Sequence, residues 1–284
     1  MQPIKPDFMG IGAQKCATTW LYSVLEEHPG IAMAMPSDGD KDTRFFSFFY
    51  DRGFAWYDKQ FPDDVSGKLV GEMSTSYFPS VEAPARVHGY APEVKLIVCL
   101  RHPVERAFSN HKHEISVGRV EGDNRVFENA LAQNPMYLEQ SRYYTHLSRW
   151  LEYFPRENVL VLLLEDIHAD PGQAVKQIYE FLGVDSNFQP SDLRRKVHET
   201  QVISSAGSSS LLKNVAGVMR VLGLSKLIRF LRNRGLQSAA TRRMSDSGSD
   251  VFPPMQEETI SRLLQYFENE NQLLADLLER DLSS

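Results

Sequence analysis

Cysteine is scarce in this sequence. The 284 residues include only Cys16 and Cys99, and both fall in segments expected to form the core or a binding site. Two thiols in such positions do not form the framework of bridges that small secreted domains need, so the sequence predicts a reducing, cytoplasmic location. With 42% hydrophobic residues, a chain of this length can bury a substantial core without metals or cross-links.

Long apolar runs are also missing. Near the N-terminus, prolines and polar residues interrupt the segment MQPIKPDFMG before the first apolar stretch begins. No stretch there is long enough for a signal peptide or a membrane span, so we expect a soluble protein. The sequence shows no internal repeat either, which argues against a solenoid or an array.

The segment Phe8–Leu25, FMGIGAQKCATTWLYSVL, lacks the Walker A pattern of P-loop proteins but has other features of an anion-binding turn. An apolar run stops at a turn with Lys15 and continues into a helix opened by Thr18 and Thr19. The first N–H groups of a helix lack internal partners and lie at its positive end, so this arrangement predicts an anion-binding turn. A Walker A loop places Gly-Lys directly before Ser or Thr, but no glycine precedes Lys15. A nucleotide kinase or nucleotide-binding regulatory protein of the P-loop class is therefore the alternative, not the first choice.

A second segment, Lys95–His113, supplies another cation. Its apolar residues 96–100 predict a buried strand that ends at Arg101, and a proline then begins a helix that carries Ser109 two turns along. Ligands of parallel sheets collect at the carboxyl ends of the strands. We therefore expect Arg101 on the same edge of the sheet as Lys15.

Short apolar segments alternate with helical ones along the chain. This alternation predicts a single α/β domain over residues 1–284, with a central parallel sheet flanked by helices. The predicted strands are Phe8–Gly12, Leu69–Glu72, Leu96–Leu100 and Val159–Leu164. The predicted helices are Thr18–Glu27, Val104–Gly118, Phe127–Gln133, Thr145–Phe154, Pro171–Leu182 and Glu257–Leu278.

Two motifs occur in the order typical of one enzyme family. GAQKCATTWL resembles the 5′-phosphosulfate loop, and LRHPVERAFS resembles the 3′-phosphate motif RxPxxRxxS, of the sulfotransferases that use 3′-phosphoadenosine 5′-phosphosulfate (PAPS). The resemblance implies their P-loop-like fold, PAPS as donor, adenosine 3′,5′-bisphosphate (PAP) as product, and no required metal. It places the cofactor-binding residues at Gly12, Ala13, Gln14, Lys15, Cys16, Ala17, Thr18, Thr19, Trp20, Arg101, Ser109 and Arg142.

Within that family the chain is most similar to the heparan-sulfate and related carbohydrate branch. KDTRFF and GEMSTSYF resemble the Glu-x-His-Phe-Phe and Glu-Lys-Thr-Pro-x-Tyr-Phe elements of that branch. The resemblance implies two catalytic candidates, Lys15 on the bridging oxygen and Asp42 as general base. Glu72, at the end of a predicted strand, is a second candidate for the base. The chain departs from the family pattern at four positions, where the family has Gly, Glu, His and Lys: Ala17, Asp42, Arg44 and Met73.

Several roles stay open at this stage. Glu72 is either a second candidate base or a structural hydrogen-bond acceptor. Arg142 either contacts the donor or forms a surface salt bridge. The acceptor is a hydroxyl or amine of a saccharide, a lipid or another small molecule. No nucleic-acid partner is expected, and the sequence does not set the oligomeric state.

Acidic residues are absent from one segment of this acidic chain. Residues 204–243 hold eight lysines and arginines and no Asp or Glu, whereas the whole chain has a net charge of −6. Apolar residues at roughly helical spacing predict a basic amphipathic insertion or lid at about 204–245. One interpretation is that residues 211–243 contact the donor, an anionic acceptor or an anionic membrane surface, and the other is a docked helix pair with solvated charges.

Overall fold

The computed structural model describes residues 3–36, 40–191, 193 and 252–282. These residues form two compact units. The first comprises the described parts of 1–107, 136–200 and 260–284 and contains the sheet. The second comprises 108–135 and the described part of 201–259. The predicted basic insertion at 204–245 lies outside the described residues.

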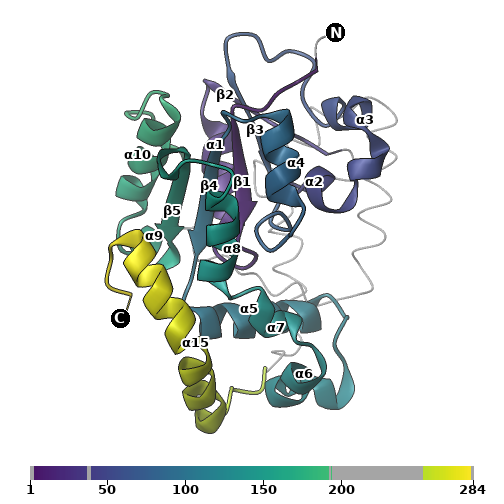
Figure 1. The fold of residues 1–284 in the computed structure, drawn as a ribbon, viewed down its shortest axis with the longest axis vertical. Helices are drawn as coiled ribbons and strands as arrows, with labels where there is room; N and C mark the ends of the chain where they lie inside the picture. Colours follow the sequence, from purple (N-terminus) through teal and green to yellow (C-terminus); the bar gives the residue numbers. More distant parts are fainter. Residues whose placement is uncertain (1–2, 37–39, 192, 194–251, 283–284) are drawn as a thin grey trace. The chain divides into compact units, whose positions relative to one another are not determined.

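In the described part of the chain, five parallel strands form one sheet in the order β2-β3-β1-β4-β5, and helices flank it (Figure 1). The strands are β1 (Phe8–Gly12), β2 (Ile31–Met33), β3 (Leu69–Met73), β4 (Lys95–Leu100) and β5 (Val159–Leu163). The predicted α/β class with a parallel sheet is confirmed. The sequence missed β2, because three apolar residues are too few to show a period.

The helices repeat the predicted pattern with additions. Described helices are α1 (Thr18–Glu27), α2 (Phe45–Phe48), α3 (Phe54–Asp58), α4 (Ala83–Tyr90), α5 (Pro103–Ser116), α6 (Phe127–Gln133), α7 (Met136–Glu139), α8 (Tyr143–Leu151), α9 (Leu164–Ala169), α10 (Pro171–Leu182) and α15 (Glu257–Leu278). Four of the six predicted helices have the predicted bounds. The other two, α5 and α8, differ from the prediction by one to three residues at each end, and α2, α3, α4, α7 and α9 were not predicted.

Local chemistry explains why the ends of α10 were predictable. The side chain of Asp170 caps the helix by accepting a hydrogen bond from the N–H of Gln173, and Pro171 occupies the first turn. Gly183 ends the helix in the left-handed conformation, with φ of 81°. All three signals are readable in the sequence.

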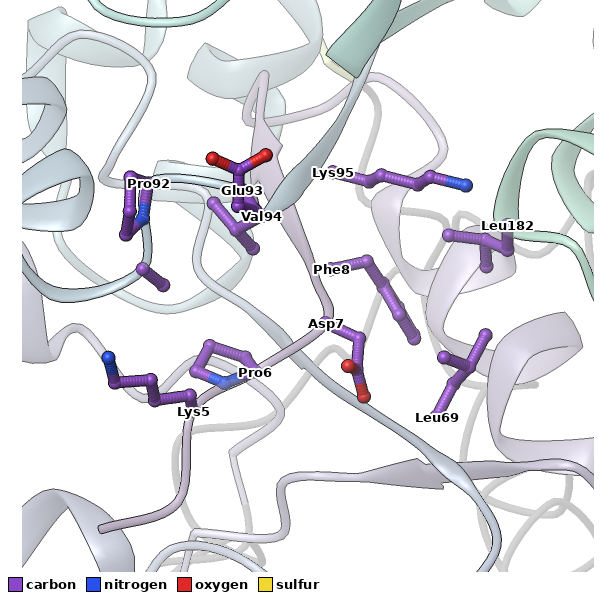
Figure 2. Close-up of a pocket in the computed structure, with 11 residues that line it drawn as sticks. Lys5, Pro6, Asp7, Phe8, Leu69, Pro92, Glu93, Val94, Lys95 and Leu182 are labelled. Carbon is purple, nitrogen blue, oxygen red and sulfur yellow. The ribbon is translucent and has the colours of Figure 1, made fainter.

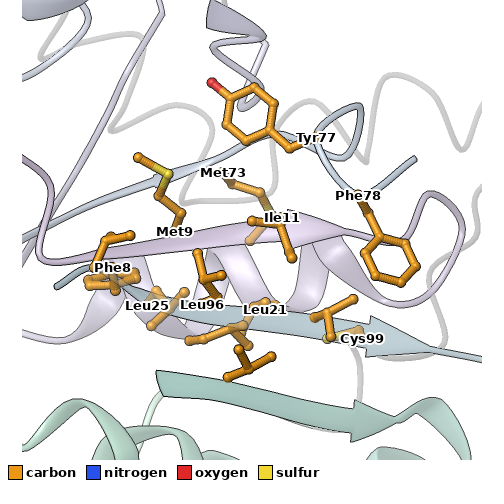
Figure 3. Packing of buried hydrophobic residues seen from close by; sticks show 14 of the residues in the cluster. Phe8, Met9, Ile11, Leu21, Leu25, Met73, Tyr77, Phe78, Leu96 and Cys99 are labelled. Atoms are coloured by element: carbon orange, nitrogen blue, oxygen red, sulfur yellow. The ribbon is translucent and has the colours of Figure 1, made fainter. Parts of the chain in front are cut away.

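The core surrounds β1, whose five residues are all buried. Figure 3 shows Phe8, Met9 and Ile11 of β1 among apolar side chains of neighbouring strands and of α1. Helix α1 buries Leu21, Leu25 and other residues along one face, as helical spacing requires. The strand that leads to the Lys15 turn therefore lies at the centre of the sheet and is firmly packed.

The contact between Gly71 and Phe8 generates a test of this packing. A Cβ atom at Gly71 would lie 2.0 Å from the ring of Phe8, which is fully buried. We expect Gly71→Ala to lower the free energy of unfolding by about 1–3 kcal/mol because the ring cannot move without strain. Urea denaturation measures the change.

The matched control is Gly89→Ala on α4. No atom lies within 4 Å of the added methyl group there, and a helical alanine is better than glycine by about 0.5–1 kcal/mol. The control should be neutral or more stable than the wild type. Equal stability of the two variants would contradict this account of the sheet.

Candidate active site

The turn between β1 and α1 holds the first predicted anion site. Gly12 has φ of 153°, and a Cβ there would lie 2.7 Å from the Cβ of Phe78, so only glycine fits. Lys15 and Ala17 both have positive φ, of 70° and 57°. Ala17 is the N-cap of α1 and provides no side-chain hydrogen bond. The positive end of α1 therefore faces the turn without a side-chain cap, which suits an anionic ligand.

Arg101 lies at the carboxyl end of β4, which pairs in parallel with β1. The N–H of Ala13 donates to the carbonyl oxygen of Cys99 at 2.8 Å, so the turn is tied to the end of β4. Because both strands run in the same direction and are neighbours, the Lys15 turn and Arg101 lie at one edge of the sheet, as expected from the sequence.

The positive charge of Arg101 acts on Cys16, which lies in the Lys15 turn. Burial raises the pKa of the Cys16 thiol to about 11, and the positive charges of Arg106 and Arg101 counteract part of this rise. The guanidinium of Arg101 forms an ion pair with Glu105 on the first turns of α5, at 2.8 Å. Both groups of this pair are partly or largely exposed.

Arg106 holds α5 in place, and the sequence analysis assigned it no role. Its guanidinium is fully buried and donates to the hydroxyl of Ser141 at 2.5 Å, to the carbonyl oxygen of Tyr137 at 2.5 Å and to the amide oxygen of Gln140 at 3.2 Å. Each partner is uncharged, and burial lowers the pKa of Arg106. Its place as the second arginine of RxPxxRxxS was the available signal.

The remaining donor candidates have different surroundings. Ser109 is buried on α5, in the second compact unit. Arg142 precedes α8 and forms ion pairs with Glu139 at 3.4 Å and with Glu270 at 3.2 Å. The structure thus places Arg142 in an ion-pair network, and its contact with the donor stays a prediction.

Asp42 lies beside the carboxyl end of β3. It forms an isolated parallel bridge with Met73, and one carboxylate oxygen pairs with the ammonium group of Lys41. The other accepts hydrogen bonds from the N–H and the hydroxyl of Thr75, at 3.0 and 2.6 Å. Since β3 is the other neighbour of β1, Asp42 shares the edge of the sheet with the Lys15 turn.

Glu72 is enclosed within the core and has no exposed surface. Its carboxylate accepts hydrogen bonds from the hydroxyls of Thr43, Tyr57 at 2.7 Å and Tyr77 at 3.2 Å. Burial raises the pKa of this carboxyl to about 7, against the lowering effect of the three hydroxyls. A carboxylate without exposed surface cannot take a proton directly from a bound acceptor, so the geometry favours a structural role.

The edge of the sheet opposite Lys15 carries a surface pocket of about 440 Å³ (Figure 2). Phe8, Leu69 and Lys95, the first residues of β1, β3 and β4, line it together with Lys5. Ligands of parallel sheets bind at the carboxyl ends of the strands. This pocket lies at the amino ends of the strands, so we do not propose it as the site that binds the anionic ligand.

Two further observations concern the described residues as a whole. In this part of the chain, no three or more His, Cys, Asp or Glu side chains are grouped in a way that could hold a metal ion. None of the helices described combines the length and the apolar character that a membrane span requires.

The burial of Glu72 predicts a pH dependence of stability. In addition to burial, the hydroxyls of Thr43, Tyr57 and Tyr77 lower the pKa of this group and the charge of Asp42 raises it. The folded protein holds a proton on Glu72 up to about pH 7, whereas the unfolded chain releases it near its usual pKa of 4.5. The free energy of unfolding should therefore fall by about 3 kcal/mol as the pH rises through this window.

Urea denaturation of the wild type and of Glu72→Gln, at pH 5 and pH 8, measures this effect. Other titrating groups are common to both proteins, so the difference between the two pH dependences isolates Glu72. The variant should lack the loss of stability seen in the wild type. The same loss in both proteins would show that Glu72 titrates normally.

Comparison with known proteins agrees with the geometry of this edge. The model of the sulfotransferase domain family matches residues 5–213. Over 184 residues the chain is 34% identical to heparan sulfate glucosamine 3-O-sulfotransferase 6 of Mus musculus, with 63% of this chain and 52% of the relative covered. It is 28% identical to bifunctional heparan sulfate N-deacetylase/N-sulfotransferase 2 of Homo sapiens, over 97% of this chain and 30% of the relative.

The chain thus spans about half the length of the first relative and under a third of the second. A sulfotransferase from Alicyclobacillus acidocaldarius has the same fold, with a TM-score of 0.68, 23% identity, and 99% of this chain and 98% of that chain covered. None of these comparisons supports the alternative of a nucleotide kinase. The match over most of the described sheet and its site shows that the chain belongs to the sulfotransferase domain family.

Proposed function

We propose that the chain transfers a sulfuryl group from PAPS to a hydroxyl or amino group of a saccharide, a lipid or another small molecule, and releases PAP. One observation carries the proposal: the Lys15 turn and Arg101 end neighbouring parallel strands and share one edge of the sheet. A nucleotide with phosphates on both sides of its ribose needs two separate cationic sites, and two neighbouring strand ends can supply them.

The residues of the turn fit the 5′ end of such a donor. Only glycine fits at residue 12, so the backbone can come close to a ligand, and the positive end of α1 faces the turn. PAPS supplies an activated sulfuryl group on its 5′-phosphate. Lys15 and the N–H groups of α1 would stabilise the negative charge that grows on the departing phosphate oxygen, with Thr18 and Thr19 as further donors.

The RxPxxRxxS motif predicts that Arg101 and Ser109 bind the 3′-phosphate, and we assign this phosphate to Arg101. A guanidinium can bind two phosphate oxygens at once, which a neutral 3′-hydroxyl cannot match. The other cation of the motif, Arg106, supports α5 from within the core. It therefore contributes to this site by fixing the helix that follows Arg101.

Asp42 is the base that we propose for the acceptor. The strand order β3-β1-β4 places Asp42, Lys15 and Arg101 in sequence along the edge, so the acceptor side lies across the Lys15 turn from the 3′-phosphate side. As the acceptor oxygen or nitrogen bonds to sulfur, the bond between sulfur and the phosphate oxygen breaks. The acceptor proton passes to the carboxylate of Asp42.

The acceptor class is proposed from relatives and chemistry together. The relatives named above carry heparan sulfate in their names, which favours a saccharide. Met73 and Arg44 differ from the branch pattern, so we expect the acceptor pocket to differ at these two residues from that of the heparan-sulfate branch. We also propose a cytoplasmic location, supported by the free and buried thiols of Cys16 and Cys99.

Lys15→Ala tests the catalytic assignment. Removal of the ammonium group should lower kcat by roughly 100- to 1000-fold, the usual effect of deleting one group that stabilises transition-state charge. Transfer of radioactive sulfate from PAPS to a mixture of N-acetylated and de-N-sulfated heparan oligosaccharides, followed by mass spectrometry, gives the rate. Lys5→Ala, at the opposite edge of the sheet, is the matched control and should keep full activity; unchanged transfer by Lys15→Ala would remove Lys15 from the mechanism.

Arg101→Ala tests donor recognition without turnover. Loss of its hydrogen bonds to a charged group should weaken the binding of PAP by about 10- to 100-fold. Binding of adenosine 5′-phosphate, which lacks the 3′-phosphate, should change little. Isothermal titration calorimetry with both nucleotides, and with ATP and magnesium for comparison, measures the differences. Equal losses for the two adenosine nucleotides would refute the assignment, and tighter wild-type binding of magnesium ATP than of PAP would refute the proposed donor.

A further inference from the structure

Thr43 connects the proposed base to the interior of the protein. It follows Asp42 directly and is 1% exposed. Its hydroxyl donates to the carboxylate of Glu72 and lies 2.8 Å from the hydroxyl of Tyr77 and 3.2 Å from that of Ser74. The residue beside Asp42 is therefore anchored by side chains of β3 and the segment after it.

The backbone near Asp42 is held by the same segment. The N–H of Thr43 donates to the carbonyl oxygen of Met73 at 3.2 Å, and the N–H of Arg44 donates to the hydroxyl of Ser74 at 2.8 Å. The N–H of Phe46 donates to the hydroxyl of Tyr77 at 3.2 Å. Hydrogen bonds to the end of β3 and to the segment after it thus fix the backbone of residues 43–46.

The direction of these hydrogen bonds depends on Glu72. Above about pH 7, where Glu72 loses its proton, its carboxylate can only accept, and it has hydroxyl donors on both oxygens. The single proton of the Thr43 hydroxyl is then committed to Glu72, which leaves the Thr43 oxygen to accept from the N–H of Phe45 at 3.4 Å. A glutamine at residue 72 would turn a donor toward one of these hydroxyls and break the pattern.

We propose that Glu72 is a positioning residue that acts through Thr43 to hold the carboxylate of Asp42 at the edge of the sheet where the donor turn lies. This inference rests on the proposed function, with Asp42 as the base. It assigns to Glu72 an effect on the chemical step although the group has no exposed surface. A misplaced base costs rate even when the substrate still binds.

Two substitutions at Thr43 test the link. Thr43→Val keeps the shape of the side chain and removes the hydroxyl, while Thr43→Ser keeps the hydroxyl and removes a methyl group. We expect Thr43→Val and Glu72→Gln to lower kcat for the heparan oligosaccharide mixture at least tenfold, with the KM for PAPS and the Kd for PAP within twofold of the wild type. Thr43→Ser should keep kcat within threefold.

Tyr57→Phe provides the matched control. Tyr57 donates to Glu72 at 2.7 Å, but no hydrogen bond joins its hydroxyl to residues 42–46 in the described structure. This variant disturbs the carboxylate and leaves the Thr43 contact in place. A loss of kcat in Thr43→Val that clearly exceeds the loss in Tyr57→Phe supports positioning through Thr43, whereas equal losses would overturn it.

A second measurement needs no turnover. Hydrogen–deuterium exchange of the amides of residues 43–46 should be slow in the wild type and in Thr43→Ser, and at least tenfold faster in Thr43→Val and Glu72→Gln. Unchanged exchange in these two variants overturns the inference, as does unchanged kcat. Absence of PAP binding by the wild type would instead refute the proposed function, while the exchange comparison would still decide whether Glu72 fixes this segment.

Discussion

The parallel pairing of β1 with β3 and β4 is the constraint on which the site depends. Parallel strands end on the same edge, so three segments distant in sequence deliver their polar residues to one place. The apolar residues of β1 take no part in the proposed reaction, but their burial fixes the strand end from which the Lys15 turn begins. The site is thus a consequence of the sheet more than of any local motif.

Two ionisable side chains among the described residues are fully buried and are held in the same way. Arg106 and Glu72 are both fully buried, and their hydrogen-bond partners are uncharged. Removing an ion from water is costly, and hydrogen bonds from neutral groups offset only part of that cost. The hydrogen bonds of Arg106 connect α5 to residues 137–141, and those of Glu72 connect β3 to Thr43. In both cases the buried group helps to fix the backbone of a neighbouring segment.

Much of this fold could be predicted because its signals are local. The bounds of α1 and α10 follow from apolar spacing, an aspartate cap, a proline and a glycine. The strand β2 and the short helices α2 and α3 escaped prediction because tertiary contacts hold them, among them the stacking of Phe45 on Tyr57 with ring centres 4.6 Å apart.

Some features of the candidate site could likewise be predicted from the sequence, and others depend on tertiary contacts. Lys15 and Arg101 could be placed on one edge because each follows a predicted parallel strand, whereas Asp42 was assigned by resemblance and only the structure brings it to that edge. The contacts of Thr43 could not be predicted, because they join residues 29 to 34 positions apart through hydroxyl groups, and neither periodicity nor spacing reveals such pairings. The sequence also does not show which of the two candidate bases, Asp42 or Glu72, has no exposed surface, since that depends on the aromatic residues packed around Glu72.

The ion pair between Arg101 and Glu105 would compete with the proposed nucleotide for the same guanidinium. A ligand that binds the Nε and Nη2 side of the guanidinium would have to displace the carboxylate of Glu105, which is held at high local concentration. A doubly charged phosphate can win this exchange, whereas a hydroxyl group cannot. The pair would therefore filter the abundant nucleotides of the cell by rejecting those without a phosphate at the ribose 3′ position.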